Sequence, residues 1–317
     1  MRKKILGKTG IEVTILAIGT LTMSPMQRGL CIDEGAEVIL YALSAGVNFI
    51  DTAQMYGSYP QVKAALRRWM GADPVLASKS AAKTYDAMET AVKECLEGTH
   101  RKFIDIFLLH AVRDLDDFNS RSGALEALIK AKEKGHIRAI GLSSHSAQTI
   151  GQMASNAYID ILHPMINRDG IGILDASLDQ MMTFLHSAKE NGKGVYAMKP
   201  LGGGHLRNDA SKALRWLFSQ DLVDSAAVGM TTFEEVDMNV ALANNKEVSH
   251  DFARKVAGQP RKLFINEMIC QNCNACVKAC QQMALKSGKT HPFIDYAKCI
   301  LCGYCAPECP RFAIRIV

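Results

Sequence analysis

The stretch GVNFID, residues 46–51, has the pattern of one short strand in a parallel sheet. It is a mostly apolar run that follows a glycine and ends at an aspartate. Seven other runs of this kind recur roughly thirty residues apart, with helical patterns between them. They are VTILAIGT (13–20), PVLASK (74–79), FIDIFLLH (103–110), HIRAIGLSS (136–144), YIDILH (158–163), GVYAMK (194–199) and DSAAVGM (224–230). Apolar strands that alternate with helices indicate a parallel sheet covered by helices.

Eight strand–helix units predict the fold class α/β, in the form of a closed (β/α)8 or TIM barrel. The segments 33–46, 85–99 and 121–135 place apolar residues three and four apart, and each is expected to be a helix that stops at a glycine. A doubly wound open sheet is the alternative fold. It is disfavoured because no glycine-rich dinucleotide fingerprint follows the first strand.

The composition argues against several classes of protein. With 317 residues, 48% hydrophobic and 22% charged, the chain suits one large globular domain and a small one. No run of eighteen apolar residues predicts a membrane span, and MRKKILGKTG (1–10) lacks the apolar core of a signal peptide. We therefore expect a cytoplasmic protein. The net charge of +5 resides in a basic tail without interleaved aromatics, so nucleic-acid binding is not expected.

Polar residues end three successive strand-like runs. These are Asp51, Lys79 and His110, and Tyr56 follows five residues after Asp51. In such barrels the catalytic groups come from the C-terminal ends of the strands, so the four side chains should meet at one mouth. A lysine cation is expected to lower the pKa of a nearby tyrosine, and the aspartate to hold that lysine charged. The set could then protonate an alkoxide forming from a carbonyl, with the imidazole orienting the oxygen.

Each of these residues alone has a simpler interpretation. Asp51 could cap a helix, Lys79 could be solvated, and His110 could be a core histidine with satisfied hydrogen bonds. Because four suitable residues stand at or near consecutive strand ends, the acid–base site is favoured over these separate roles.

The ten cysteines fall into two groups. Cys31 and Cys95 stand alone and are interpreted as small buried hydrophobes. The other eight lie in CQNCNACVKAC (270–280) and CILCGYCAPEC (299–309). A disulfide framework would suit a secreted protein, and without a signal peptide metal binding is favoured.

The spacing C-x2-C-x2-C-x3-C, present twice, is typical of bacterial ferredoxins with two 4Fe–4S clusters. The two halves repeat at an offset of 29 residues, from Phe264 and from Phe293, and each should supply a strand, a cysteine loop and a helix. In this arrangement the fourth cysteine of each run binds the other cluster. The expected ligand sets are Cys270, Cys273, Cys276 and Cys309 for one cluster, and Cys299, Cys302, Cys305 and Cys280 for the other. Zinc is the alternative, but its paired C-x2-C spacing does not fit.

The segments LGKTGIEVTILAIGT (6–20), GVNFIDTAQMYG (46–57), ASK (77–79) and DIFLLH (105–110) resemble the aldo-keto reductases. The resemblance runs from about residue 3 to 245. It implies a barrel opened by a short N-terminal hairpin and a catalytic tetrad of Asp51, Tyr56, Lys79 and His110. It also implies that NAD(P)H lies across the barrel mouth and that a small carbonyl or alcohol is the substrate.

The same resemblance assigns the nicotinamide cofactor to loops after strands 5 to 8. The implied cofactor-binding residues are Ser143, Ser144, His163, Met198, Lys199, Leu201, Gly203, Gly229, Thr231, Thr232 and Asn239. Three positions depart from the family pattern: Met198 replaces an aromatic residue, Ser144 an asparagine, and Glu235 an arginine that often binds the 2′-phosphate. Since an acid would repel that phosphate, strict NADPH use is disfavoured.

The predicted domains are a barrel at 1–250, a linker at 251–262 and an α+β ferredoxin-like domain at 263–317. A nicotinamide gives two electrons as hydride, whereas each cluster passes one, so three interpretations remain open. The first is an NAD(P)H-dependent carbonyl reductase whose clusters are structural or sense oxidation. The second is a barrel fed by its clusters, with an external ferredoxin or flavoprotein as partner. The third is a non-catalytic electron carrier or redox sensor.

Overall fold

The predicted barrel is confirmed by a computed structural model, which describes residues 1–257, 262–311 and 313–316. Eight parallel strands close in the order β10–β3–β4–β5–β6–β7–β8–β9, with β9 paired to β10. Their bounds are β3 Leu16–Gly19, β4 Phe49–Asp51, β5 Val75–Ser80, β6 Ile104–Leu109, β7 Ile137–Ser144, β8 Ile161–Pro164, β9 Gly194–Met198 and β10 Ser225–Gly229. These strands fall on the eight runs predicted from the sequence. Their C-terminal ends form the mouth of the barrel.

The first predicted strand, 13–20, is divided in the structure between the end of β2 (Glu12–Thr14) and the barrel strand β3. β1 (Lys3–Ile5) and β2 form an antiparallel hairpin, and β3 begins two residues later at Leu16. The N–H of Ile15 still donates to the carbonyl of Arg2, whereas its carbonyl accepts from Ala226 next to the barrel. The chain therefore leaves the hairpin and joins the barrel at this residue.

The hairpin closes the end of the barrel that lies opposite the mouth. Leu6, Ile11 and Val13 are almost fully buried and pack in one cluster with interior side chains such as Phe49 and Ile106. Burial of side chains of this size contributes about 1.5–3 kcal/mol each. The barrel interior is thus a packed core, open toward the mouth alone in the described part of the chain.

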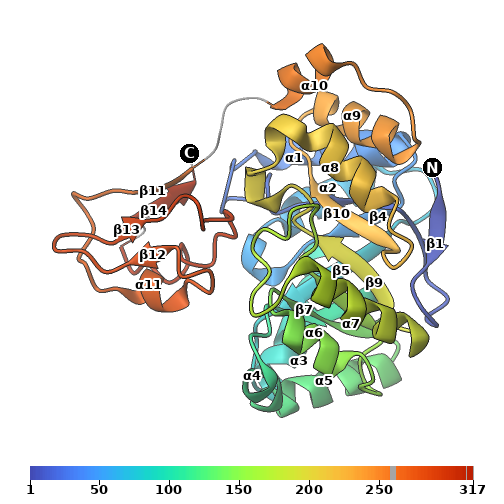
Figure 1. The fold of residues 1–317 in the computed structure, drawn as a ribbon. Coiled ribbons are helices and arrows are strands. Elements are labelled where there is room, and N and C mark those ends of the chain that lie inside the picture. The colour runs from blue at the N-terminus through green and yellow to red at the C-terminus, as the bar shows by residue number, and fades with distance from the viewer. Residues whose placement is uncertain (258–261, 312, 317) are drawn as a thin grey trace.

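Nine helices of the described chain surround the barrel (Figure 1). They are α1 Ile32–Ser44, α2 Tyr59–Arg68, α3 Tyr85–Thr99, α4 Leu115–Asn119, α5 Ser122–Glu133, α6 Ala147–Met153, α7 Leu178–Glu190, α8 Ala210–Phe218 and α9 Phe233–Ala243. The longer helices have an apolar face because their buried residues recur three and four apart, as in α3. Among the described residues, no helix is both long and apolar enough to cross a membrane.

The three helices predicted in detail are present, but α3 does not stop at a glycine. It continues through Gly98 and ends at Thr99, where His100 adopts the left-handed conformation with φ of 57°. A Cβ on Gly98 would lie 3.0 Å from the ring of Tyr59 on α2. Gly98 therefore serves close packing between two helices, and His100 provides the helix end.

The small C-terminal domain forms a separate lobe beside the barrel (Figure 1). It contains two short antiparallel pairs, β11 (Leu263–Ile265) with β14 (Ile314–Ile316) and β12 (Leu285–Lys286) with β13 (Phe293–Ile294). Each pair joins the first strand of one sequence half to the last strand of the other half. Helix α10 (His250–Ala257) precedes the domain and covers the first part of the predicted linker at 251–262, whose residues 258–261 lie outside the described part of the chain.

The expectation of a helix in each half is wrong for the second half. The first half forms α11 (Ala275–Ala279), whereas residues 303–309 form successive turns. Pro307 lies within that stretch and lacks the N–H that a helix would direct to the carbonyl of Gly303. The turns are closed instead by Ala306 and Cys309, whose N–H groups donate to Gly303 and Ala306.

Candidate active site and iron–sulfur domain

The four residues predicted to be catalytic meet at the barrel mouth. Asp51 ends β4, Lys79 lies in β5, His110 follows β6, and Tyr56 closes a short 3-10 turn (Gln54–Tyr56). Nζ of Lys79 lies 2.8 Å from Oδ1 and 2.9 Å from Oδ2 of Asp51. The same nitrogen is 5.0 Å from the ring centre of Tyr56. All four side chains are buried, so their interactions are weakly screened by water.

Burial shifts the pKa values of Tyr56 and His110 in the tetrad. It raises the pKa of Tyr56 well above its ordinary value, and nearby Tyr304 and Asp51 raise it further. Burial also lowers the pKa of His110 well below 6.5, and the Lys79 cation contributes to this. The expected lowering of the Tyr56 pKa is therefore not found, because burial of the phenol outweighs the nearby lysine cation. Tyr56 is a neutral proton donor in this structure, and His110 is a neutral imidazole.

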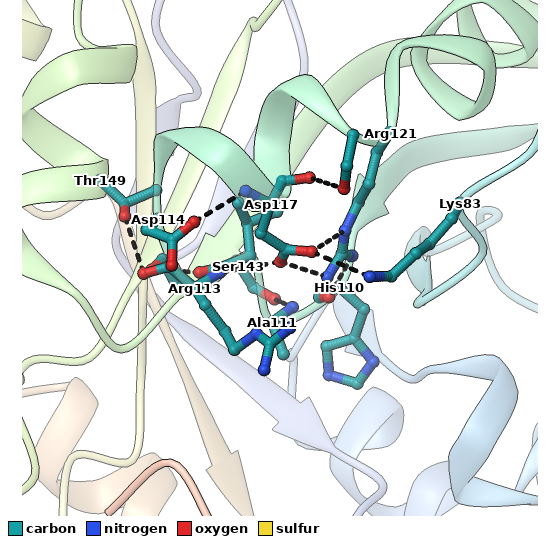
Figure 2. Close-up of polar contacts among 12 residues, drawn as sticks. Lys83, His110, Ala111, Arg113, Asp114, Asp117, Arg121, Ser143 and Thr149 are labelled. Atoms are coloured by element: carbon teal, nitrogen blue, oxygen red, sulfur yellow. Dashed lines mark hydrogen bonds and ion pairs between the residues drawn. The ribbon is translucent and has the colours of Figure 1, made fainter. Parts of the chain in front are cut away.

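A buried network fixes the backbone of His110 (Figure 2). Arg121 donates from Nη1 to the carbonyl of His110 at 2.8 Å and from Nη2 to Asp117 at 2.6 Å. The next residue, Ala111, has a positive φ of 53°, and its N–H donates to Oγ of Ser143 at 2.8 Å. The chain thus turns sharply after His110, and the imidazole points away from this network (Figure 2).

Tyr196 supports the tetrad from β9 and was missed by the sequence reasoning. Its hydroxyl donates to Oδ1 of Asp51 at 3.1 Å, and its carbonyl accepts from Nδ1 of His163 at 2.6 Å. The rings of Tyr196 and His163 stack with centres 3.8 Å apart. Burial lowers the pKa of His163 to about 4. A signal was available, since Tyr196 stands two residues before Met198 and strand alternation gives both the same face.

A cavity of about 510 Å³ starts at the tetrad and reaches α9. Eight of the predicted cofactor-binding residues line it: Ser143, His163, Met198, Lys199, Leu201, Gly203, Gly229 and Asn239. The other three have different contacts. The hydroxyl of Ser144 donates to the carbonyl of Val112 at 2.6 Å, that of Thr231 lies 2.9 Å from Oε2 of Glu235, and Thr232 caps α9.

Several buried polar atoms along this cavity fit a polar ligand. Oγ1 of Thr22, Nε of Arg207 and Oδ1 of Asn239 have no hydrogen-bond partner within the described residues. A buried polar group without a partner costs about 1–3 kcal/mol, which a bound ligand would relieve. Donors and an acceptor along a cavity that Lys199 also lines suit the amide, ribose and phosphate groups of a nicotinamide dinucleotide.

The eight cysteines of the C-terminal domain surround two small cavities. The proximal set, nearer the barrel, is Cys280, Cys299, Cys302 and Cys305. The distal set is Cys270, Cys273, Cys276 and Cys309. Each cavity thus has three cysteines from one half of the repeat and one from the other. This is the grouping expected from the sequence.

The chemistry of both sets fits iron–sulfur clusters. All ten cysteines are free thiols, which disfavours a disulfide framework. Cys95 is buried as expected, whereas the expectation is wrong for Cys31, which is exposed and caps α1. Backbone N–H groups of Ala284 and Ala313 donate to the sulfurs of Cys280 and Cys309 at 3.2 and 3.3 Å. Within the described ranges no three potential ligands lie close enough to hold a single metal ion. A 4Fe–4S cluster, with one iron for each thiolate, spreads its ligands wider than a zinc ion does.

The proximal set rests against the barrel mouth. Nε2 of His205 lies 2.8 Å from the carbonyl oxygen of Cys299, and Gln27 donates to the carbonyl of Leu301 at 3.1 Å. The hydroxyl of Tyr304 lies 3.3 Å from Nε2 of His110 in the tetrad. The sequence reasoning missed Tyr304, because cysteine spacing predicts a ferredoxin fold without saying which surface docks on the barrel.

The model of the aldo/keto reductase family matches residues 16–212, more than half of the chain, and the protein belongs to this family. The model of a 4Fe-4S binding domain matches residues 292–315. The protein is therefore an oxidoreductase of this family that carries a ferredoxin-type iron–sulfur domain.

Individual relatives are distant. The chain is 21% identical to an uncharacterized oxidoreductase of Bacillus subtilis, YqkF, over 79% of this chain and 94% of that protein. It is 22% identical to L-galactose dehydrogenase of Arabidopsis thaliana, over 77% of this chain and 88% of that one. The structure of an aldo-keto reductase from Bacillus halodurans superimposes with a TM-score of 0.65 at 19% identity, covering 81% of this chain and 97% of that one. The last similarity establishes the fold alone.

Proposed function

We propose that this protein interconverts a small carbonyl compound and its alcohol, with NAD(P)H as hydride donor and the buried tetrad as proton donor. The observation that carries the proposal is the tetrad at one end of the 510 Å³ cavity. The same cavity leads to unpartnered polar atoms on Arg207 and Asn239. A proton-transfer site and a groove for an extended polar ligand are thus continuous.

The residues of the tetrad would share one reduction as follows. When bound, the nicotinamide supplies a hydride to the carbonyl carbon, so that the carbonyl is reduced and NAD(P)H is oxidised to NAD(P)⁺. Tyr56 gives its proton to the carbonyl oxygen as the C=O π bond breaks. Lys79, 5.0 Å from the Tyr56 ring, stabilises the phenolate left behind, and Asp51 holds that lysine in place.

The cavity also bears on which nucleotide binds. Glu235 lines the cavity near the start of α9, and its Oε2 lies 2.9 Å from the hydroxyl of Thr231. A carboxylate at this point repels a 2′-phosphate and can hydrogen-bond to a ribose hydroxyl. We therefore expect NADH to bind more tightly than NADPH.

We also propose two 4Fe–4S clusters, one for each set of four cysteines. Six of these cysteines are partly or fully buried by the domain's own core, whereas Cys273 of the distal set is exposed. The distal cluster is thus suited to meet an external redox protein and the proximal cluster to meet the barrel.

A second candidate function is supported by the contact between Tyr304 and His110. In this case reduced ferredoxin or a flavoprotein gives electrons singly to the clusters, and two electrons with two protons reduce the carbonyl to the alcohol. The hydroxyl of Tyr304 lies 3.3 Å from His110, and Tyr304 stands between two ligands of the proximal set. The proposed cluster ligands Cys302 and Cys305 are thus within two residues of a side chain that contacts the tetrad.

An anaerobic experiment on the cluster-loaded protein separates the two candidates. NADH or NADPH is mixed with acetaldehyde or benzaldehyde, and nucleotide oxidation, alcohol formation and the visible cluster absorbance are followed together. Under the first proposal one alcohol forms for each nucleotide oxidised while the clusters stay oxidised. Tyr56→Phe should lower this turnover about 10²–10⁴-fold with iron content unchanged. Tyr158→Phe, at an exposed tyrosine, is the matched control.

Other outcomes have definite meanings. If neither nucleotide binds, yet dithionite bleaches the clusters and an aldehyde restores their colour, the second candidate is supported and the first is wrong. Equal turnover by Tyr56→Phe and the wild type would overturn the role of the tetrad in both.

A further inference from the structure

The loop that holds three proximal cysteines, residues 299–305, is built into the barrel mouth. We call it the cluster loop. Its Ile300 is 1% exposed and packs between Met165 and Met198 of the barrel. The backbone of the loop is also hydrogen-bonded to the barrel. His205 contacts the carbonyl of Cys299, and Gln27 donates to the carbonyl of Leu301. The loop therefore has an apolar anchor with hydrogen bonds around it.

Two barrel glycines make room for this loop. A Cβ on Gly203 would lie 2.0 Å from the carbonyl oxygen of Ile300, and one on Gly172 would lie 3.1 Å from the Ile300 side chain. Both glycines have positive φ, 69° and 84°, which other residues rarely adopt. The barrel surface thus matches the cluster loop in shape at the level of its backbone.

Tyr304 extends from the cluster loop into the tetrad. Its ring stacks on buried His145 with centres 5.7 Å apart and meets His110 edge-on at 5.6 Å. The ring of Tyr56 lies on another side of His110, with centres 5.7 Å apart. His110 therefore lies between two tyrosines, and the hydroxyl of Tyr304 lies 3.3 Å from its Nε2.

That hydroxyl lies where the oxygen of a substrate is needed. In the proposed chemistry His110 orients the carbonyl oxygen that takes a proton from Tyr56, and it would do so through Nε2, because Nδ1 is buried and has no partner among the described residues. In this structure Nε2 is already engaged by Tyr304. The hydroxyl oxygen of Tyr304 and the carbonyl oxygen of a substrate would therefore compete for Nε2 of His110.

We propose that Tyr304, supplied by the iron–sulfur domain, is a specificity-determining residue of the barrel active site. Its hydroxyl holds the position of the substrate's oxygen at His110, and a substrate binds by displacing it. The inference rests on the proposed carbonyl–alcohol chemistry. Because Cys302 and Cys305 flank Tyr304 closely in the cluster loop, displacement also moves ligands of the proximal set.

Steady-state kinetics on the holoprotein test the competition. Tyr304→Phe keeps the ring and removes the hydroxyl, so the KM for acetaldehyde should fall about 2–10-fold with kcat little changed, the range expected for one hydrogen bond. Tyr304→Ala removes the ring as well and should favour benzaldehyde over acetaldehyde relative to the wild type. Tyr158→Phe is the control, since Tyr158 is exposed and does not line the cavity. Iron content and absorbance verify that each variant is folded.

A binding experiment without nucleotide keeps this inference separate from the proposed function. The clusters are reduced with dithionite, and benzyl alcohol, which offers an oxygen but cannot be reduced at a carbonyl, is added. We expect it to alter the electron paramagnetic resonance signal of one cluster in the wild type. In Tyr304→Phe it should bind more tightly and alter that signal less.

The inference is overturned by either of two results. One is a KM in Tyr304→Phe that is unchanged or raised, which would make the hydroxyl irrelevant or a binding partner of the substrate. The other is that benzyl alcohol binds to the wild type and to Tyr304→Phe with equal affinity and equal signal change. This second result decides the question even if no aldehyde is turned over and the proposed function fails.

Discussion

Replacement of His163 by glutamine should remove part of the acid sensitivity of the barrel. His163 is 2% exposed, and burial lowers its pKa from 6.5 to about 4 despite the neighbouring Asp51. Lys79 and Lys199, also close to it, lower that pKa as well. The unfolded chain therefore binds more protons than the folded one between these two pKa values. Stability is complete above pH 6.5 and is lost as the pH falls toward 4.

The size of this effect follows from the two pKa values. Between pH 7 and pH 5 a histidine that shifts from 6.5 to about 4 on folding costs about 2 kcal/mol of unfolding free energy. Glutamine does not titrate, and its amide can still donate to the carbonyl of Tyr196 as Nδ1 of His163 does. Buried His110 and His145 remain in both proteins, so their contributions cancel in the difference.

Urea unfolding at pH 7 and pH 5 measures this difference. The two tryptophans, Trp69 and Trp216, both belong to the barrel, so their fluorescence reports barrel unfolding without a signal from the small domain. We expect the wild type to lose about 2 kcal/mol more than His163→Gln between these pH values. His136→Gln, at an exposed histidine, is the control. Equal losses in wild type and His163→Gln would refute the reasoning that burial keeps His163 neutral.

Two further changes test the clusters and the tetrad. Cys273→Ala should leave the holoprotein with about half of its iron, since one of the two proposed clusters loses a ligand. The control Cys31→Ala should retain all of its iron, and full iron in Cys273→Ala would contradict the proposed ligand sets. Asp51→Asn should lower the unfolding free energy by about 3–5 kcal/mol, because it leaves the buried Lys79 cation without its anion. Thermal unfolding measures this loss, and the control Asp86→Asn, at an exposed carboxylate, should stay within about 0.5 kcal/mol of the wild type. Equal melting temperatures for Asp51→Asn and Asp86→Asn would contradict the ion-pair argument.

The barrel and the tetrad were predictable because both depend on local sequence patterns. Buried parallel strands are short apolar runs, and the residue that ends each run must lie at the mouth, so Asp51, Lys79 and His110 could be placed together. The missing helix in the second half was also within reach, because Pro307 is visible in the sequence. The direction of the Tyr56 pKa shift was not predictable, because it depends mainly on how deeply the folded chain buries that side chain.

The position of the iron–sulfur domain could not be predicted for a different reason. The cysteine spacing specifies contacts within that domain, whereas docking depends on Ile300 fitting against Gly172 and Gly203, more than ninety residues earlier in the chain. Neither glycine is distinguishable in sequence from one that forms an ordinary turn. Tyr304 therefore appeared as a spacer between two cysteines until its contact with His110 was seen.

The N-terminal hairpin has a kinetic consequence. Leu6, Ile11 and Val13 close one end of the barrel, so within the described residues the proposed reactants and products would share one opening at the other end, where the cluster loop lies. When two molecules enter a cavity through one opening, the molecule that binds deeper must bind first and leave last. We therefore expect substrate and nucleotide to bind and leave in a compulsory order. Release of product through this opening, rather than the proposed transfer of hydride and proton, should then limit turnover.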